Sequence, residues 1–269
     1  MARRAYGSTP VICLHASASS GAQWNALAGA LGAGRRVHAP GLIGYRDGAP
    51  WDGRSRVTLD VEARALEPLL ARAPRGAHLV GHSFGAAVAL RLALLHPRAV
   101  RSLALYEPVL FSVLRDEPSC AAELREILSV RTAVRRAVNS GRARSAAQSF
   151  VEYWSGAPAW AGLEPARREA LAGRMNKVDT EFDAALYDAT PLAAHLDLET
   201  PALLVTGEST RRPTRRIVER LAAVLPRHEY CELAGAGHMG PLTHAGALNA
   251  RIAALLEACE QPLVLARAA

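Results

Sequence analysis

The chain has 269 residues, of which 50% are hydrophobic, 21% are charged and 5% are aromatic. This length and balance predict one substantial apolar core, and they exclude both a disordered protein and a small domain that depends on disulfide bonds. No stretch approaches the roughly 18 uncharged apolar residues of a membrane-spanning helix. The first residues are basic but lack a long apolar segment, which argues against a secretory signal. We therefore expect a cytoplasmic protein without a membrane span.

Arginine supplies nearly all of the positive charge, because Lys177 is the only lysine in a chain whose formal net charge is +7. The arginines are spread along the sequence between acidic residues, and this distribution does not favour nucleic-acid binding. The densest group consists of Arg211, Arg212, Arg215, Arg216 and Arg220. Such a group is typical of a solvated helix face, and the alternative is a rim that attracts anionic substrates.

Cysteine and glycine patterns give no sign of a bound cofactor. The four cysteines are Cys13, Cys120, Cys231 and Cys259. They lack the spacing of metal ligands, so we interpret them as buried small apolar residues in a reducing compartment. The sequence has neither a Walker glycine loop nor a G-x-G-x-x-G after a strand. We therefore expect no metal ion and no organic cofactor.

Strands and helices are predicted to alternate over much of the chain. Short runs rich in β-branched residues predict strands at 10–15, 36–39, 77–81, 100–106, 201–207 and 228–233. Helical spacing of apolar residues predicts helices at 22–31, 57–73, 86–95, 214–225 and 245–259, with a glycine-rich loop at 41–56. This alternation predicts an α/β fold, with a mostly parallel sheet of about six strands flanked by helices.

Between residues 108 and 199 the alternation stops and the pattern is helical. Helices are expected at 120–138, 143–154, 165–173 and 181–188, and half of the aromatic residues lie in this part of the chain. We interpret residues 108–199 as a helical cap, inserted into a core formed by 1–107 and 200–269. Most of the aromatics would pack the cap against the core, and one face of the cap would bound a cleft.

The strongest chemical signal is Gly81-His82-Ser83-Phe84-Gly85, which lies between a predicted strand and a predicted helix. The pattern G-x-S-x-G in this context indicates a tight turn that raises a serine above the sheet. Side chains at the two glycine positions would collide with the neighbouring strand or helix. Ser83 is therefore the expected nucleophile, and the amide N–H of Phe84 is one expected oxyanion donor.

A serine hydroxyl needs a base, and His238 is the best candidate among the nine histidines. It lies after the last strand, in a glycine-rich loop, and a late histidine is the usual order with this serine turn. The second oxyanion donor is expected from the loop at 15–21, with the N–H of Ser17 as the candidate. His15 begins that loop and would either orient it or be purely structural.

Together these motifs resemble the α/β-hydrolase fold with a helical cap, in the group of esterases, lipases and C–C hydrolases. The resemblance covers nearly the whole chain and rests on the Gly81–Gly85 turn, His15-Ala16 followed by Trp24, Tyr106-Glu107-Pro108, Gly207 and Gly237-His238. It implies a catalytic triad and an apolar cleft for a small-molecule substrate. The candidate substrate contacts are Trp24, His15, Phe111, Trp154 and Met239.

The acid of the triad is the point at which the chain departs most from this family. The family usually has an Asp about three residues after a Gly that follows the penultimate strand, but Thr210 holds that position in this sequence. Glu107, at the end of the strand after the serine helix, is one substitute, and Glu208 is another. In a third alternative no carboxylate takes part. We favour Glu107, because some family members supply their acid from that strand end.

The leading prediction is a serine hydrolase that cleaves an ester of a mainly apolar small molecule through an acyl-enzyme. One alternative is a lyase or C–C bond hydrolase that uses the same residues. Another is a weakly catalytic ligand-binding protein, to which the missing aspartate gives weight. The sequence leaves the substrate and the oligomeric state open.

Overall fold

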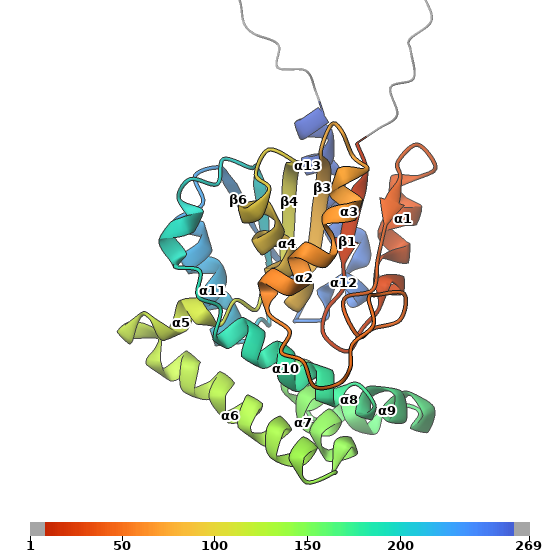
Figure 1. The fold of residues 1–269 in the computed structure, drawn as a ribbon, viewed down its shortest axis with the longest axis vertical. Coiled ribbons are helices and arrows are strands. Elements are labelled where there is room, and N and C mark those ends of the chain that lie inside the picture. Colours follow the sequence, from red (N-terminus) through yellow and green to blue (C-terminus); the bar gives the residue numbers. More distant parts are fainter. Residues whose placement is uncertain (1–8, 261–269) are drawn as a thin grey trace, which may run out of the picture.

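A computed structural model of the chain describes residues 9–260, which form one sheet of six parallel strands covered by helices (Figure 1). The strands are β1 (Val11–Leu14), β2 (Val37–His38), β3 (Ala77–His82), β4 (Val100–Tyr106), β5 (Ala202–Gly207) and β6 (His228–Leu233). Their order in the sheet is β2-β1-β3-β4-β5-β6, and every neighbouring pair is parallel. The predicted parallel sheet of about six strands is confirmed.

Two sets of helices accompany this sheet. Those outside the helical insertion are η1 (Gly21–Trp24), α1 (Asn25–Leu31), α2 (Leu59–Ala65), α3 (Glu67–Ala71), α4 (Phe84–Leu95), α11 (Arg212–Ala222), α12 (Gly240–Thr243) and α13 (Ala245–Glu260). Those between β4 and β5 are α5 (Ser112–Arg115), η2 (Pro118–Cys120), α6 (Ala121–Asn139), α7 (Ala143–Ser155), α8 (Pro158–Ala161), α9 (Pro165–Ala172), α10 (Met175–Leu186) and η3 (Leu192–His195). In residues 9–260 no helix combines the length and apolar character needed to cross a bilayer.

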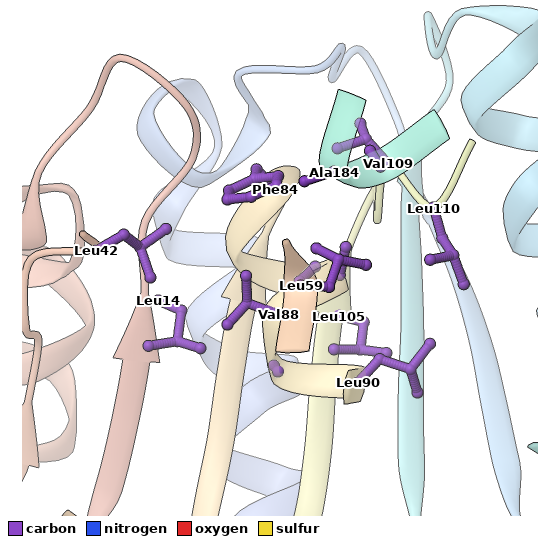
Figure 2. Close-up of a cluster of buried hydrophobic side chains, with 14 of the residues drawn as sticks. Leu14, Leu42, Leu59, Phe84, Val88, Leu90, Leu105, Val109, Leu110 and Ala184 are labelled. Atoms are coloured by element: carbon purple, nitrogen blue, oxygen red, sulfur yellow. The ribbon is translucent and has the colours of Figure 1, made fainter. Parts of the chain in front are cut away.

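The two faces of the sheet carry separate apolar clusters because side chains alternate along each strand. Val11 and Cys13 of β1 belong to the cluster that includes residues of α1 and α13. Ile12 and Leu14 belong to the larger cluster, which includes residues of α2, α4 and α11. Figure 2 shows part of this larger cluster between the strands and α4. Helices on both faces therefore bury a sheet whose central strands are mainly apolar, as is typical of a parallel sheet.

The helices between β4 and β5 gather at one end of the sheet, at the bottom of Figure 1. Buried side chains from these helices are continuous with the larger apolar cluster of the core; they include Ile127, Val134, Trp154, Met175 and Phe182. The helical insertion predicted between core strands is confirmed. Its division from the core at residues 108 and 199 stays a prediction.

Some predicted helices differ from the observed ones for local reasons. The helix predicted at 57–73 is two helices, α2 and α3, with Pro68 in the first turn of the second. Proline lacks an amide donor and clashes with the carbonyl four residues earlier, so it breaks a continuous helix. The helix predicted at 181–188 begins earlier, at Met175, because its buried face also includes Lys177 and Val178.

The first turn of α4 lies against the end of β1 at Gly85. A Cβ atom on this residue would lie 2.4 Å from the carbonyl oxygen of Leu14 and 2.5 Å from that of His15. Backbone atoms cannot move aside as the end of a side chain can. The collision expected from the sequence at this glycine therefore has a definite partner, the backbone of β1 and the residue after it.

Gly85→Ala should destabilise the fold by about 2 kcal/mol or more, because the helix and the strand must separate to admit the methyl group. Gly29→Ala is the matched control, since Gly29 lies in α1 and a Cβ there would meet nothing within 4 Å. That control should stabilise the protein by about 0.5–1 kcal/mol through helix propensity. Urea unfolding of both variants measures the two effects, and equal stability changes would contradict the close packing of α4 on β1.

Candidate active site

Ser83 occupies the turn between β3 and α4 in a conformation that is rare for a residue with a side chain. Its φ of 56° and ψ of −119° lie outside the usual regions for an L-residue. The turn is held by the Ser83 amide, which donates to the carbonyl of Tyr106 at 3.0 Å. The turn requires glycine at position 81, because a Cβ atom there would lie only 2.5 Å from the Cα of Ala86. Strain of this kind is concentrated at functional sites.

A chain of two hydrogen bonds joins Ser83 to a histidine and a carboxylate. His238 Nε2 lies 3.0 Å from Ser83 Oγ, and His238 Nδ1 lies 2.7 Å from Glu107 Oε2. An ionised carboxylate can only accept, so Nδ1 carries the proton and Nε2 is free to accept from the serine hydroxyl. All three side chains are buried. These groups come from the ends of β3, β4 and the loop after β6, which meet at the carboxyl edge of the sheet.

Glu107 is supported on its other oxygen by the residues around β5. Its Oε1 accepts from the amide of Gly207 at 3.0 Å and from the hydroxyl of Thr210. Burial by itself would raise the pKa of Glu107, but the hydrogen bonds from His238, Thr210 and Gly207 outweigh that effect and lower it. Thr210 thus occupies the position where the resemblance expects an aspartate, and its hydroxyl is directed at the carboxylate that β4 supplies.

Glu208, the other acid considered from the sequence, lies apart from this chain of contacts. Its side chain is exposed, and Oε2 accepts from the amide of Gly235 at 2.7 Å. This contact links the loop after β5 to the loop after β6 without reaching His238. The geometry therefore favours Glu107 over Glu208 as the partner of the histidine.

Several groups hold His238 in place. His82 Nε2 donates to the carbonyl of His238 at 2.7 Å, and Tyr106 donates its hydroxyl to the carbonyl of Gly237 at 2.6 Å. Burial lowers the pKa of His82 well below its ordinary value, so this ring is a neutral structural donor. From the insertion, Trp154 of α7 stacks on the His238 ring with centroids 3.8 Å apart and planes at 23°. Hydrogen bonds to the carbonyls of Gly237 and His238, together with the stacked indole of Trp154, thus hold the imidazole in place.

The loop after β1 includes a backbone donor, at Ser17, that has no acceptor within residues 9–260 and lies at the same cavity as Ser83. The amide of Ala16 donates to Gln23 Oε1 at 3.2 Å, and that of Ala18 donates to the hydroxyl of Tyr45 at 2.9 Å. Between them, the Ser17 amide has no acceptor among residues 9–260. Ser17 and Phe84 line the same small cavity as Ser83. Phe84 begins α4, where the first amides of a helix have no intrahelical acceptor.

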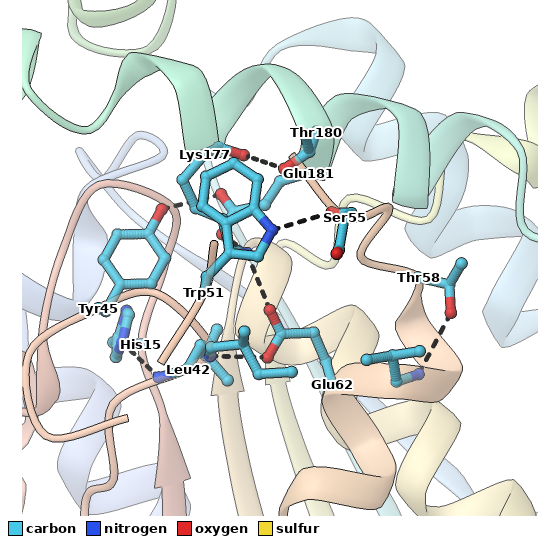
Figure 3. Close-up of polar contacts among 12 residues, drawn as sticks. His15, Leu42, Tyr45, Trp51, Ser55, Thr58, Glu62, Lys177, Thr180 and Glu181 are labelled. Atoms are coloured by element: carbon cyan, nitrogen blue, oxygen red, sulfur yellow. Dashed lines mark hydrogen bonds and ion pairs between the residues drawn. The ribbon is translucent and has the colours of Figure 1, made fainter. Parts of the chain in front are cut away.

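A buried polar cluster lies behind this loop and ties it to the insertion (Figure 3). The hydroxyl of Tyr45 donates to Glu181 Oε2 at 3.0 Å. Lys177 Nζ lies 2.9 Å from Glu181 Oε1 and 2.8 Å from Glu62 Oε1. On the same side, Arg174 donates to the carbonyl of Ala18 at 2.6 Å. Helix α10 and the residue before it therefore support the loop through three side chains, at positions 174, 177 and 181.

Two larger cavities meet at the histidine. The serine-side cavity, about 250 Å³, is lined by Ser17, Ser83, one arginine, Arg167, and mainly apolar side chains that include Phe150, Leu163, Leu171 and Leu242. The histidine-side cavity, about 700 Å³, is more polar; its lining includes Ser209, Thr210, Arg211, Arg212, Thr243 and His244. Both are lined by Trp154, Ser155, His238 and Met239, whereas Ser83 lines only the first of them.

The structure brings most of the predicted site residues together and leaves two outside. Phe111, Trp154 and Met239 line the cavities around Ser83 and His238. Trp24, in contrast, is buried in the apolar cluster on the other face of the sheet and lines none of these three cavities. Its place in a motif suggested a substrate contact, but its size and apolar character suit that core equally well.

His15 also lies away from the cavities, as a buried support of the loop. Its Nδ1 donates to the carbonyl of Ala16 at 2.8 Å, and its Nε2 accepts from the amide of Leu42 at 3.1 Å. Burial lowers the pKa of this imidazole, so it is neutral. His15 lines none of the three cavities, and these bonds agree with a role as an orienter of the loop.

Sequence reasoning missed Gln23, Tyr45 and Arg174, which hold the loop after β1. Gln23 accepts from Ala16 and donates to His82, so it joins this loop to the support of His238. None of the three belongs to a motif. For Gln23, the one available signal of this role was its polar side chain in an otherwise apolar helical turn. Tyr45 and Arg174 come from distant segments, so only the tertiary structure could show their roles.

No group of three or more histidine, cysteine or carboxylate side chains within residues 9–260 is placed to hold a metal ion. All four cysteines are free; Cys13 and Cys120 are buried as expected. Cys231 and Cys259 are partly exposed, so the expectation of burial is wrong for them. Cys231 lies on β6, an edge strand with one paired neighbour, which leaves its side chain less covered.

Comparison with known proteins agrees with this geometry. The family model described as the alpha/beta hydrolase family matches residues 11–251. The chain belongs to this family. The fold predicted from the sequence resemblance is confirmed, including the helices between β4 and β5.

Curated relatives align with part or most of this chain. A pimeloyl-[acyl-carrier protein] methyl ester esterase of Aromatoleum aromaticum is 29% identical over 258 residues, which cover 87% of this chain and 92% of that protein. A pyrethroid hydrolase of Sphingobium wenxiniae is 38% identical over 105 residues, 38% of this chain and 36% of that protein. The polyketide synthase ThaQ of Burkholderia thailandensis is 31% identical over 188 residues, 67% of this chain and 8% of that protein.

Solved structures agree with the family in fold. The alpha/beta hydrolase MGS-M2, from a deep-sea metagenome library of the Medee basin, superimposes with a TM-score of 0.75 at 14% identity and covers 96% of this chain and 92% of that one. A thermophilic esterase from Thermogutta terrifontis gives a TM-score of 0.72 at 19% identity and covers 95% of this chain and 92% of that one. At these identities the likeness concerns the fold.

The pH dependence of unfolding should carry a signature of Glu107. A carboxyl whose pKa is lowered in the folded state stabilises the fold above its unfolded pKa of about 4.3, and this stabilisation is lost as the pH falls through the folded-state pKa. The stability difference between the native chain and Glu107→Gln, from urea unfolding, should therefore shrink as the pH falls from about 6 to about 3. Glu208→Gln is the exposed control. A difference that grows on acidification would contradict a lowered pKa for the Glu107 carboxyl.

Proposed function

We propose that this chain is a serine hydrolase that cleaves carboxylic esters, with Ser83 as nucleophile, His238 as general base and Glu107 as the acid that orients the histidine. The observation that carries the proposal is the continuous set of contacts from Ser83 Oγ through both nitrogens of His238 to Glu107 Oε2, at 3.0 and 2.7 Å. Distances of this kind suit proton transfer between nucleophile and base.

In the acylation step, Ser83 Oγ attacks the carbonyl carbon of the ester while His238 Nε2 takes the hydroxyl proton. The oxyanion of the tetrahedral intermediate accepts hydrogen bonds from the amides of Ser17 and Phe84. His238 then gives its proton to the leaving alkoxide as the carbon–oxygen bond breaks. Glu107 stabilises the imidazolium that exists between these two transfers, through the bond to Nδ1.

In the deacylation step, water replaces the alcohol. His238 Nε2 takes a proton from the water as its oxygen attacks the acyl carbon, and the amides of Ser17 and Phe84 again hold the oxyanion. Collapse of the intermediate breaks the bond to Ser83 Oγ, which regains the proton from His238. The carboxylic acid is released and the enzyme returns to its starting state.

The apolar lining of the serine-side cavity favours an ester whose acyl part is mainly apolar. Phe150, Trp154, Leu163 and Leu171 contribute carbon surface there, and Met239 closes the side next to His238. Two of the curated relatives are named for ester or pyrethroid hydrolysis, which supports the same class. Phe111, Trp154 and Met239 are the proposed substrate contacts. Arg167 also lines this cavity, whereas Arg174 donates to the carbonyl of Ala18 and Lys177 pairs with Glu62.

A weakly catalytic binding protein is the less favoured alternative. The absence of an aspartate after β5 was the argument for this alternative. Glu107, from the end of β4, contacts His238 and provides a carboxylate in its place. A lyase or C–C bond hydrolase would use the same residues, and substrate tests separate these reactions from ester cleavage.

Ser83→Ala should lower the turnover of p-nitrophenyl esters by at least about 10⁴-fold, because no other group can form the acyl-enzyme. The native chain should add one fluorophosphonate at Ser83, identified by mass spectrometry of peptides, and the variant should add none. A label on another residue would overturn the assignment of the nucleophile. Labelling of Ser83 without turnover of any ester from acetate to decanoate would favour the lyase or C–C hydrolase.

Glu107→Gln should lower kcat by about 10²- to 10⁴-fold, because the amide cannot stabilise the imidazolium and can favour the wrong tautomer. Glu208→Gln is the matched control: it makes the same change on an exposed side chain whose one hydrogen bond within residues 9–260 is from the Gly235 amide, and its effect should be less than about threefold. Steady-state kinetics on one p-nitrophenyl ester gives both values. A larger loss from the control than from Glu107→Gln would make Glu208 the acid.

A further inference from the structure

The two cavities that meet at His238 correspond to the two halves of an ester. The serine-side cavity is lined by Ser17 and Ser83, which would hold the acyl carbon and its oxygen. The histidine-side cavity is lined by His238 but not by Ser83. The base must reach the leaving oxygen to protonate it, so the leaving group extends into the cavity on its side. This assignment of the halves rests on the proposed function.

Arg211 is an exposed side chain that lines the histidine-side cavity and gives it a positively charged group. Its Nε donates to the carbonyl of Tyr153 at 2.9 Å, and its guanidinium lies over the Tyr153 ring, 4.8 Å from the centroid. These contacts hold the plane of the guanidinium but leave both terminal nitrogens without an acceptor among residues 9–260. A guanidinium of this kind presents a pair of donors suited to a carboxylate or a phosphate.

Arg211 differs in this respect from the other arginines of its group. Each of the other four contacts a carboxylate: Arg212 with Glu123, Arg215 with Glu232, Arg216 with Glu219 and Arg220 with Glu117. No carboxylate pairs with Arg211 in the part of the chain that the structure describes. The solvated helix face expected from the sequence thus accounts for the four paired arginines, and Arg211 is left without this explanation.

One acidic side chain, Glu126, also lines the histidine-side cavity. Its Oε1 accepts from the hydroxyl of Tyr153 at 2.8 Å, so it supports the same tyrosine on which Arg211 lies. It forms no ion pair with Arg211 in residues 9–260. Tyr153, held by Glu126, therefore supports the guanidinium of Arg211. The terminal nitrogens of Arg211 remain available to a ligand.

We propose that Arg211 binds an anionic group in the leaving-group half of the substrate. The chain would then hydrolyse an ester or thioester whose acyl part is apolar and whose alcohol or thiol part carries a carboxylate or a phosphate. Charge-assisted hydrogen bonds from the terminal nitrogens would hold that anion while His238 protonates the leaving atom. The mainly apolar lining of the serine-side cavity, which also includes Arg167, suits the acyl part, and Arg211 supplies the positive charge on the histidine side.

The test compares hexanoyl thioesters that share one acyl group and differ in the thiol. N-Acetylcysteamine provides the neutral thiol, 3-mercaptopropionate the carboxylate, and coenzyme A the phosphates; thiol release is followed with a chromogenic disulfide. The native chain should show kcat/KM about tenfold higher for at least one anionic thioester than for the neutral one. Arg211→Gln should bring that ratio close to one, mainly through KM. Raising the salt to about 1 M should also reduce the ratio in the native chain.

Arg216→Gln is the matched control, because it removes the same charge from the next turn of α11 at a side chain that pairs with Glu219 outside the cavity. It should keep the ratio of the native chain. Equal kcat/KM for all three thioesters, or equal loss of the ratio in the two variants, would overturn the proposal. Preference for coenzyme A alone would identify a phosphate site, and preference for both anions a general anion site.

Binding to the Ser83→Ala variant separates this inference from the proposed function. Calorimetric titration of that variant with the same thioesters measures affinity without turnover, so the anion site is tested even where no thioester is hydrolysed. Tighter binding of an anionic thioester that is lost on addition of Arg211→Gln supports the anion site. Absence of turnover in the native chain beside such binding would count against the serine hydrolase alone, whereas no difference in affinity would count against the anion site.

Discussion

Close approach of α4 to the end of β1 is the constraint on which the arrangement at the carboxyl edge depends. With no side chain at Gly85, the first turn of the helix rests against the carbonyls of Leu14 and His15. The Phe84 amide at the start of that helix and the Ser17 amide in the loop after that strand are thereby brought to the cavity that Ser83 also lines. These residues come from elements far apart in the sequence, and they share one cavity because the backbones that carry them touch.

The carboxylate of this site comes from β4, and the parallel sheet explains why the change is tolerated. Neighbouring parallel strands end at the same edge, so the ends of β4 and β5 both lie within reach of the loop that carries His238. With the carboxylate at the end of β4, the position after β5 where the family usually has an aspartate carries no charge. Thr210 occupies that position, and its hydroxyl donates to Glu107. Glu107 itself has a φ of 46°, so this position accepts a strained backbone to direct its side chain.

Features encoded in short segments were predictable from the sequence, and features made by contacts between distant segments were not. Alternating apolar runs indicated the succession of strands and helices, and the glycines around Ser83 indicated the turn, because both depend on neighbours a few residues away. The choice of Glu107 over Glu208 was open, since both follow strands that end at one edge. The stacking of Trp154 on His238 depends on how the insertion folds back, and the bond from Ala18 to Tyr45 joins two separate loops of the core. Trp24 lies in the apolar cluster on the other face of the sheet, which its sequence could not show because core and cleft favour the same residue type.

The single lysine of the chain is enclosed between two carboxylates at the junction of α10 with the core, and only 3% of its surface is exposed. Residues 9–260 therefore offer amine-reactive reagents no lysine on their folded surface. Acylation of Lys177 requires its ion pairs with Glu62 and Glu181 to open. The rate of modification at this one side chain, measured by mass spectrometry, therefore reports how often this junction of α10 with the core opens, without any introduced probe.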